Sequence, residues 1–157
     1  MAAEAVSIDD ARDRVRELLE RILDETDVDA EVEVEVRGDE LAAEYVGDDL
    51  GLLIGRHGET IDAIQHLAYR FATHGDGDRV PVVVDAAGYR ERRAETLYQA
   101  ADQAAQSALA DGRPVALEAM SALERKVIHE HLKSRRDIET YSEGQEPSRH
   151  LVVAPVV

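Results

Sequence analysis

Two glycines three residues apart flank a basic side chain in the segment Gly55-Arg56-His57-Gly58. An apolar stretch precedes it at residues 52–54 and amphipathic spacing resumes at Ile61, so the segment is expected to join two helices. Glycine allows a backbone to approach a phosphate closely, and the free N–H groups at the start of a helix attract an anion. These residues therefore offer non-covalent capture of a phosphate, and the alternative is a plain turn between two helices.

A second set of basic residues recurs at intervals of four, so that Arg125, His129 and Lys133 stack along one face of a helix. A wheel drawn at 100° per residue gathers the basic residues in one half: Arg125, His129, Lys133 and Arg136, with Lys126 at the margin. The other half is apolar and contains Leu123, Val127, Ile128 and Leu132. Such a face either binds an anionic polymer or is an ordinary solvated surface, and the pattern alone leaves both open.

The histidines do not have the arrangement of a metal or catalytic site. His129 and His131 are two residues apart, so on a helix they point about 200° apart and cannot easily bind one ion. His131 falls on the apolar half and is expected to be packed or partly exposed. His57, His66 and His74 lie in different expected elements, and we find no nucleophile paired with a base and no Walker-type loop. We therefore expect no enzyme activity, cofactor or metal.

The elements that must position the glycine segment alternate between two periodicities. Amphipathic spacing predicts helices over residues 9–24, 49–54 and 59–73, and alternation predicts strands over 31–36, 41–45 and 80–84. Ser7 followed by Asp10 resembles a capping box at the first helix. Residues 74–78 are expected to form a loop, and Pro81 suggests that the last strand lies at a sheet edge.

An Ala-rich helix over residues 88–110, ending at Asp111-Gly112, is expected to connect this module to a second one. The second module is predicted to contain strands over 114–118, 137–142 and 149–154, a helix over 120–133, and a turn at 143–147. The expected fold class is α+β. The expected domains are 1–87, a connecting helix over 88–112, and 113–157.

Charge is distributed unevenly along the 157 residues, whose net charge is −16. Residues 1–50 hold 18 of the 34 acidic residues and only five of the 18 basic ones, whereas residues 51–157 have a net charge of −3. A strongly acidic protein repels nucleic acid in general, but a local basic patch can exist in the nearly neutral part. The acidic third is expected to be a solubilising surface, and the alternative is a surface that binds another protein.

Composition also narrows the cellular setting. The absence of cysteine excludes disulfides and thiolate metal sites. No apolar run reaches the length of a membrane span, and the first residues lack the basic start and apolar region of a signal peptide. A cytoplasmic location is expected.

Residues 53–65 resemble the signature of KH domains, in which a Gly-x-x-Gly loop clamps the backbone of about four nucleotides. The order of the expected elements resembles the type II, or prokaryotic, KH arrangement. The resemblance implies RNA contacts at Gly55, Arg56, His57 and Gly58, with Ile54 and Ile61 lining a groove for the bases. His57 stands where many relatives carry a second basic residue, which implies a weaker phosphate grip.

Residues 124–129 resemble the Arg-x-x-x-His motif of the R-three-H domain, a module that binds single-stranded nucleic acid, and Arg125 and His129 match the naming pair. Residues 141–149 resemble the hairpin of that family, so Arg149 is expected to join the same surface. The order KH domain, long helix, R-three-H domain resembles the Jag, or KhpB, family of bacterial RNA-binding proteins. Many members also carry an N-terminal domain and linker to which nothing here corresponds.

The family resemblance implies a non-enzymatic protein that binds single-stranded RNA, or single-stranded DNA, through the KH loop and the basic face. It further implies a role in post-transcriptional regulation linked to cell-envelope growth or division, with activity as an RNA chaperone and a partner KH protein. A protein-interaction adaptor that uses the acidic N-terminal surface is the alternative function.

Overall fold

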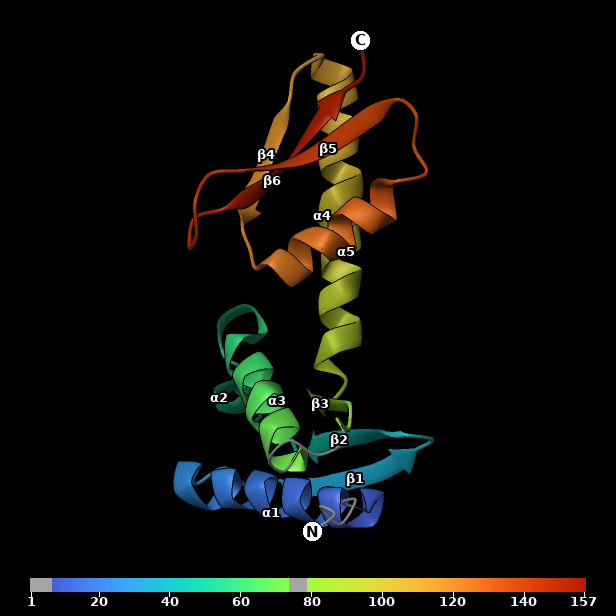
Figure 1. Cartoon of the computed structure of the whole chain (residues 1–157). Coiled ribbons are helices and arrows are strands. Elements are labelled where there is room, and N and C mark those ends of the chain that lie inside the picture. The colour runs from blue at the N-terminus through green and yellow to red at the C-terminus, as the bar shows by residue number, and fades with distance from the viewer. Residues whose placement is uncertain (1–6, 74–78) are drawn as a thin grey trace. The chain divides into compact units, whose positions relative to one another are not determined.

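The computed structural model describes residues 7–73 and 79–157 (Figure 1). The loop expected at residues 74–78 lies outside the described residues. The chain divides into two compact units, Met1–Arg90 and Glu91–Val157. Helices and strands occur in both units, so the predicted α+β class is confirmed.

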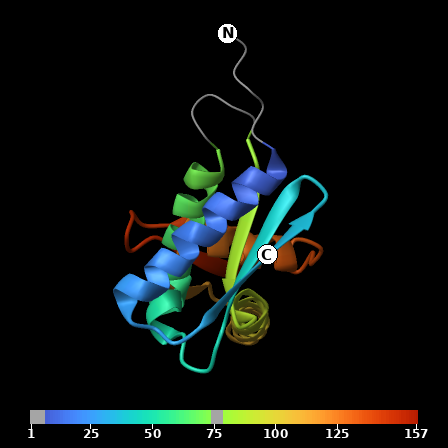
Figure 2. The same ribbon diagram turned by 90° about the horizontal axis from the view of Figure 1, so that it is seen from below.

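The first unit contains the six predicted helices and strands in the predicted order, and a short 3-10 helix in the glycine segment. They are α1 (Ile8–Thr26), β1 (Glu31–Arg37), β2 (Glu40–Val46), α2 (Gly51–Ile54), the 3-10 helix η1 (Arg56–Gly58), α3 (Glu59–Ala72) and β3 (Val82–Ala86). The strand order is β1-β2-β3, with β1 antiparallel and β3 parallel to β2. Helices α1 and α3 pack beside each other on one face of this sheet (Figure 2).

Strand β3 begins two residues later than predicted but lies at an edge of the sheet, as Pro81 suggested. Proline has no N–H to donate to a neighbouring strand. Its carbonyl does take part, because it accepts the N–H of Leu41 at 2.9 Å. The ladder between β2 and β3 then starts at the pair formed by Leu41 and Val82.

Local sequence patterns explain the core of this unit. The Ser7 hydroxyl accepts the N–H of Asp10 at 3.1 Å and so caps α1, as predicted. Helix α1 then buries residues at every fourth position: Ala11, Val15, Leu19 and Leu23. Alternation in β2 buries Leu41, Ala43 and Tyr45 against them. The Tyr45 hydroxyl donates to the carbonyl of Leu19 at 3.0 Å, which joins sheet and helix inside the core.

The opposite face of the same sheet carries most of the glutamates of β1. Glu33 lies directly opposite Glu44, and Glu35 lies opposite Ala42. Like charges placed directly opposite each other in a sheet repel, so the pair formed by Glu33 and Glu44 does not stabilise the sheet. Alternation therefore places carboxylates on the face turned away from the helices.

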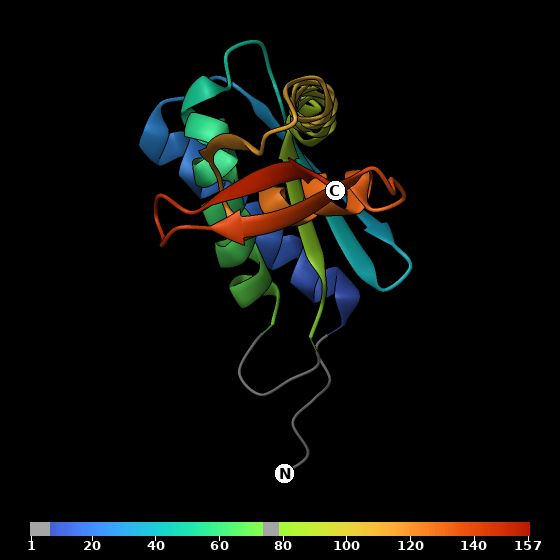
Figure 3. The same ribbon diagram turned by 90° about the horizontal axis from the view of Figure 1, so that it is seen from above.

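The second unit packs an antiparallel sheet against two helices. Its elements are α4 (Tyr89–Asp111), whose first two residues belong to the first unit, β4 (Val115–Ala119), α5 (Ala122–Leu132), β5 (Ile138–Glu143) and β6 (His150–Pro155). The strand order is β4-β6-β5, and Figure 3 shows β5 and β6 running side by side. Small buried residues of α4, among them Ala101 and Ala105, share one hydrophobic cluster with Ile128 and Leu132 of α5.

Within the described ranges, no helix is both long enough and apolar enough to cross a bilayer. The sequence assigned residues 88–112 to a separate connecting helix, whereas the structure groups α4 from Glu91 onward with the second unit.

Candidate nucleic-acid interface

The glycine segment forms a tight turn between α2 and α3. Gly55 has φ +72°, His57 φ +54° and Gly58 φ +80°, so three of its four residues have left-handed φ values. Gly58 is the N-cap of α3, and no side chain caps this helix end. The N–H of Glu59, the first residue of α3, donates to the carbonyl of Arg56, so the N–H groups that could bind an anion are those that follow it in the first turn.

Packing, as well as backbone conformation, requires glycine at both ends of the turn. A Cβ atom at Gly55 would lie 2.9 Å from the backbone nitrogen of Thr60. A Cβ atom at Gly58 would lie 2.7 Å from a ring carbon of Tyr89 at the start of α4. These contacts are closer than real Cβ atoms make, so the turn is compact because both positions lack side chains.

The side chains of this region differ in their exposure. Arg56 is exposed, while His57 and Ile54 are half-buried. Ile61 is 0% exposed and belongs to the core, which corrects the expectation that it lines a groove. The reason is helical periodicity, because Ile61 shares its face of α3 with the buried residues Ile64 and Ala68.

The first turn of α4 also holds the start of α3 in place. Arg90 forms an ion pair with Asp62 at 2.8 Å and donates to Gln65 Oε1 at 3.0 Å. Its Nε donates to the carbonyl of Val84 at 2.9 Å. The Asp62 carboxylate, one helical turn from the glycine segment, is therefore offset by a cation. No local sequence pattern marks the contacts of Arg90 with Asp62 and Gln65, because these residues are 28 and 25 positions away from it.

In the second unit, a hollow of about 400 Å³ lies between α5 and the hairpin formed by β5 and β6. It brings together the predicted residues Arg125, His129 and Arg149. Its other lining residues are Ala122, Lys126, Thr140, Tyr141, Ser142 and Leu151. The ring nitrogen Nδ1 of His129 lies within hydrogen-bond distance of the Thr140 hydroxyl, which ties α5 to β5.

Arg125 is only 7% exposed, although the helical wheel placed it on a basic face. Its Nη1 donates to the carbonyl of Met120 at 2.6 Å and to that of Arg149 at 3.5 Å. Its Nη2 forms an ion pair with Glu146 at 2.8 Å. The guanidinium thus connects the end of β4, helix α5 and the hairpin.

Lys133 and Arg136 do not line the hollow. Helix α5 ends at Leu132, so Lys133 is its C-cap and Arg136 lies beyond the helix; the wheel extended the helix too far. Lys133 is 3.5 Å from the Glu130 carboxylate. The wheel also placed Leu123 in the apolar half, whereas it is 60% exposed at the first turn.

Each of the two units matches a known protein family. The family model for the KhpA/KhpB KH domain matches residues 12–84, and that for the R-three-H domain matches residues 95–155. The RNA-binding protein KhpB of Clostridium symbiosum is 36% identical over 145 residues, which are 91% of this chain and 65% of that protein. The chain belongs to the KhpB, or Jag, family.

Other members of the KhpB family are similar over shorter spans. The RNA-binding protein KhpB of Lactiplantibacillus plantarum is 46% identical over 104 residues, which are 66% of this chain and 32% of that protein. The RNA-binding protein KhpB of Bacillus subtilis is 38% identical over 110 residues, which are 69% of this chain and 53% of that protein. The chain therefore spans about one third to two thirds of the curated relatives' lengths. KH and R-three-H domains are binding domains rather than enzymes, which confirms the expectation of a non-enzymatic chain.

The R-three-H domain presents side chains that the sequence did not single out for binding. Tyr141 is 44% exposed beside the hollow, and Thr140 and Ser142 line it from the same strand.

Two further side chains are held by partners within the same domain. Nη2 of Arg135 lies 2.7 Å from Oδ2 of Asp137, and the hydrogen bond from Arg135 lowers the pKa of the Asp137 carboxyl. The prediction that His131 is packed or partly exposed is confirmed, because it is half-buried and its ring stacks on Tyr98 with centroids 4.4 Å apart.

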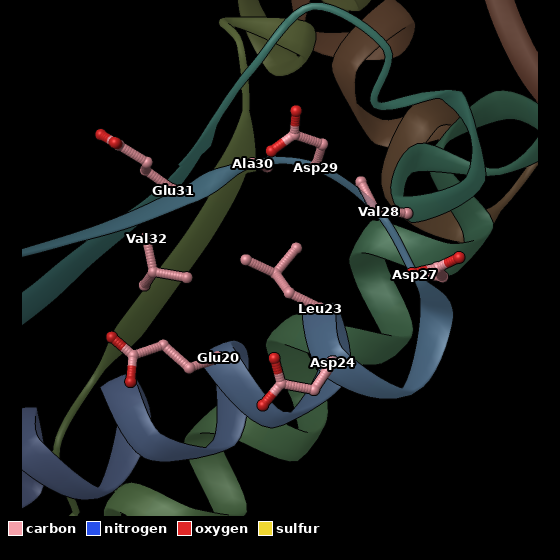
Figure 4. Close-up of a pocket in the computed structure, with 9 residues that line it drawn as sticks. All are labelled: Glu20, Leu23, Asp24, Asp27, Val28, Asp29, Ala30, Glu31 and Val32. Atoms are coloured by element: carbon pink, nitrogen blue, oxygen red, sulfur yellow. The ribbon is translucent and has the colours of Figure 1, made fainter.

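The KH domain also has a strongly acidic hollow between the end of α1 and the start of β1. Figure 4 shows carboxylates around an apolar floor made by Leu23 and Val28. The acidic lining residues are Glu20, Asp24, Asp27, Asp29 and Glu31, and no basic residue lines the hollow. Over the described part of the chain, no group of three or more His, Asp or Glu side chains is arranged to hold a metal ion. This surface repels phosphate.

Proposed function

We propose that this chain binds single-stranded RNA at two places, the glycine loop of the KH domain and the hollow of the R-three-H domain. The relatives it matches are named RNA-binding proteins. The observation that carries the proposal is the uncapped start of α3 behind a glycine turn. Backbone N–H groups at that end donate to a phosphate, and the exposed Arg56 adds a charge-assisted contact. Arg90 reduces the repulsion from Asp62.

In the R-three-H domain, the proposed contacts are the accessible side chains around the hollow. Lys126, His129 and Arg149 supply hydrogen-bond donors for phosphate, and the Tyr141 ring offers a face on which a base can stack. Arg125 supports this surface by holding the hairpin. Lys133 and Arg136, which lie outside the hollow, are proposed as flanking phosphate contacts.

In the KH domain, Ile54 is proposed as the apolar edge beside the bases, because it is half-buried and adjoins Gly55. His57 is half-buried next to Arg56 and is proposed as the weaker second contact of the loop. Bases are read there in an unstacked strand, which is why duplex RNA is expected to bind less well.

The decisive experiment replaces Arg56 and His57 with Asp and measures affinity for a labelled single strand by fluorescence anisotropy. Two carboxylates at the phosphate position are expected to weaken binding at least tenfold, about 1.4 kcal/mol. Arg113→Asp is the control, because Arg113 is exposed and lies outside both sites. Unlabelled duplex of the same sequence is expected to compete poorly. Unchanged affinity in a variant with a native circular-dichroism spectrum would refute the role of the loop.

The wider cellular role is a proposal that depends on the family. It comprises post-transcriptional regulation linked to cell-envelope growth or division, a cytoplasmic location and a partner KH protein. An adaptor that binds a basic protein is the alternative, and the row of glutamates on the outer face of β1 and β2 favours it. Pull-down from lysate with and without nuclease distinguishes the two, because only RNA-mediated capture is lost after nuclease treatment.

A further inference from the structure

A second hollow of the KH domain, of about 690 Å³, lies between α1 and α3. It is lined by Arg14, Glu17, Leu18, Arg21, Arg70 and Phe71. Three guanidinium groups and a single carboxylate thus surround an apolar floor. This is unexpected beside α1, because residues 1–50, to which α1 belongs, have more than three times as many acidic as basic residues.

Two of these arginines have no acidic partner among the described residues. The buried nitrogens Nε and Nη2 of Arg14 have no hydrogen-bond partner there. Arg70 is exposed and forms no ion pair with any residue in the described ranges. Arg21 is only loosely paired, 3.8 Å from Glu25. Unsatisfied guanidinium groups favour an anion, because a phosphate or carboxylate accepts the hydrogen bonds that the protein leaves unmade.

An exposed stripe of α3 connects this hollow with the glycine loop. Its members recur at spacings of three and four: Ala63, His66, Leu67, Arg70 and Phe71. None of these five is acidic, although the next residue at this spacing toward the loop is the exposed Glu59. At 1.5 Å per residue, Arg70 lies about 18 Å from Gly58 along the helix, a distance that a few nucleotides of an extended strand can cover.

We propose that the hollow formed by α1 and α3 binds a nucleotide of the strand whose backbone is held at the glycine loop. Arg70 and Arg21 donate to its phosphate, and its base stacks on Phe71, whose side chain is 50% exposed. This assignment depends on the proposed function. The aromatic ring favours a nucleotide over an acidic peptide, since every base has a face that stacks, whereas a carboxylate needs only the arginines.

The test compares two single strands, one of about five nucleotides that fills the loop alone and one of about 15 that also reaches the hollow. Phe71→Ala and Arg70→Ala, in the full chain, are each expected to weaken binding of the long strand about fivefold and to leave the short strand unchanged. Arg70→Ala is also expected to reduce the salt slope by about one unit. Phe71→Tyr keeps the ring and is expected to bind like the wild type.

Arg16→Ala is the matched control, because it removes the same charge from α1 at a residue that does not line the hollow. Equal losses from Arg16→Ala and Arg70→Ala, or equal losses on both strands, would show a general charge effect and overturn the assignment. It is also overturned if light scattering shows that Phe71→Ala dissociates a dimer, since the hollow would then join two copies. A wild-type chain that binds neither strand refutes the proposed function itself. If the wild type binds the long strand and the Phe71→Ala and Arg70→Ala variants bind it equally well, only the proposed nucleotide site between α1 and α3 is refuted.

Discussion

The guanidinium of Arg125 is enclosed by backbone carbonyls and by Glu146, so this arginine acts mainly within the protein. His129, the other residue of the Arg-x-x-x-His motif, is exposed and lines the hollow. The motif therefore combines a residue that positions the hairpin with one that lines the hollow. Because Arg125 and His129 are four residues apart, they are neighbours on one face of α5. This spacing alone does not show which of the two side chains is buried.

The different burial of these two residues leads to different expected effects on stability. Arg125→Met leaves the carbonyls of Met120 and Arg149 without this donor and is expected to lower the free energy of unfolding by about 2–3 kcal/mol. His129→Ala removes an exposed side chain and is expected to cost less than about 1 kcal/mol. Urea denaturation of both variants measures the difference. Equal losses would mean that the buried interactions of Arg125 contribute little.

Tyr45 leads to a prediction for alkaline pH. Burial raises the pKa of its hydroxyl above the ordinary value of about 10, because the core does not solvate the phenolate. The folded state thus retains a proton that the unfolded state releases above about pH 10. Stability is expected to be unaffected by this group below that pH and to fall as the pH rises further. Tyr45→Phe is expected to lose about 1 kcal/mol near neutral pH with the Leu19 hydrogen bond, and to show a shallower alkaline decline in urea denaturation.

At the scale of elements, the sequence predicted what local periodicity determines. Alternating Glu and Val specify β1, and apolar residues every three or four positions specify α1 and α3. Element ends were less predictable, because they depend on backbone pairing: β3 starts after Pro81, and α5 stops before Lys133. The packing of Tyr89 and Arg90 against α3 was not predicted, since it depends on tertiary structure.

The packing of α4 on the glycine loop can be measured with a double-mutant cycle. Gly58→Ala is expected to be strongly destabilising, because it places a methyl group against the Tyr89 ring at a φ of +80°. In the Tyr89→Ala background only the backbone strain remains, so the same change is expected to cost about 1 kcal/mol less. Chemical denaturation of the four proteins gives the coupling energy. A coupling near zero would show that Tyr89 does not pack against the loop.

At the scale of the whole molecule, the proposed binding of a polyanion must be reconciled with a net charge of −16. Alternation places the glutamates of β1 on the outer sheet face, and the carboxylates of Figure 4 surround a separate hollow. The glycine loop and the R-three-H hollow keep cationic side chains, while Arg90 offsets the nearby Asp62. Local charge can therefore favour RNA at two sites although the chain as a whole repels it, so affinities are best compared at moderate salt, where general repulsion is screened.

The two proposed RNA sites lead to the last prediction. If one strand occupies both sites, the second site is filled at high effective concentration, and the combined affinity exceeds that of either site. His129→Ala together with Arg149→Ala is then expected to weaken binding of a strand of about 40 nucleotides at least tenfold, but that of a strand of about five nucleotides less than twofold. The salt slope on the long strand is expected to fall by about one unit for each phosphate that the variant no longer binds.

The control for this prediction combines Arg37→Ala with Arg113→Ala, which removes two exposed cations that lie outside both proposed sites. Fluorescence anisotropy across a salt series measures each affinity. If the double variant loses the same affinity on both strands, the two domains do not grip one strand, and if it loses none, the R-three-H hollow is only a solvated surface and the KH domain binds alone.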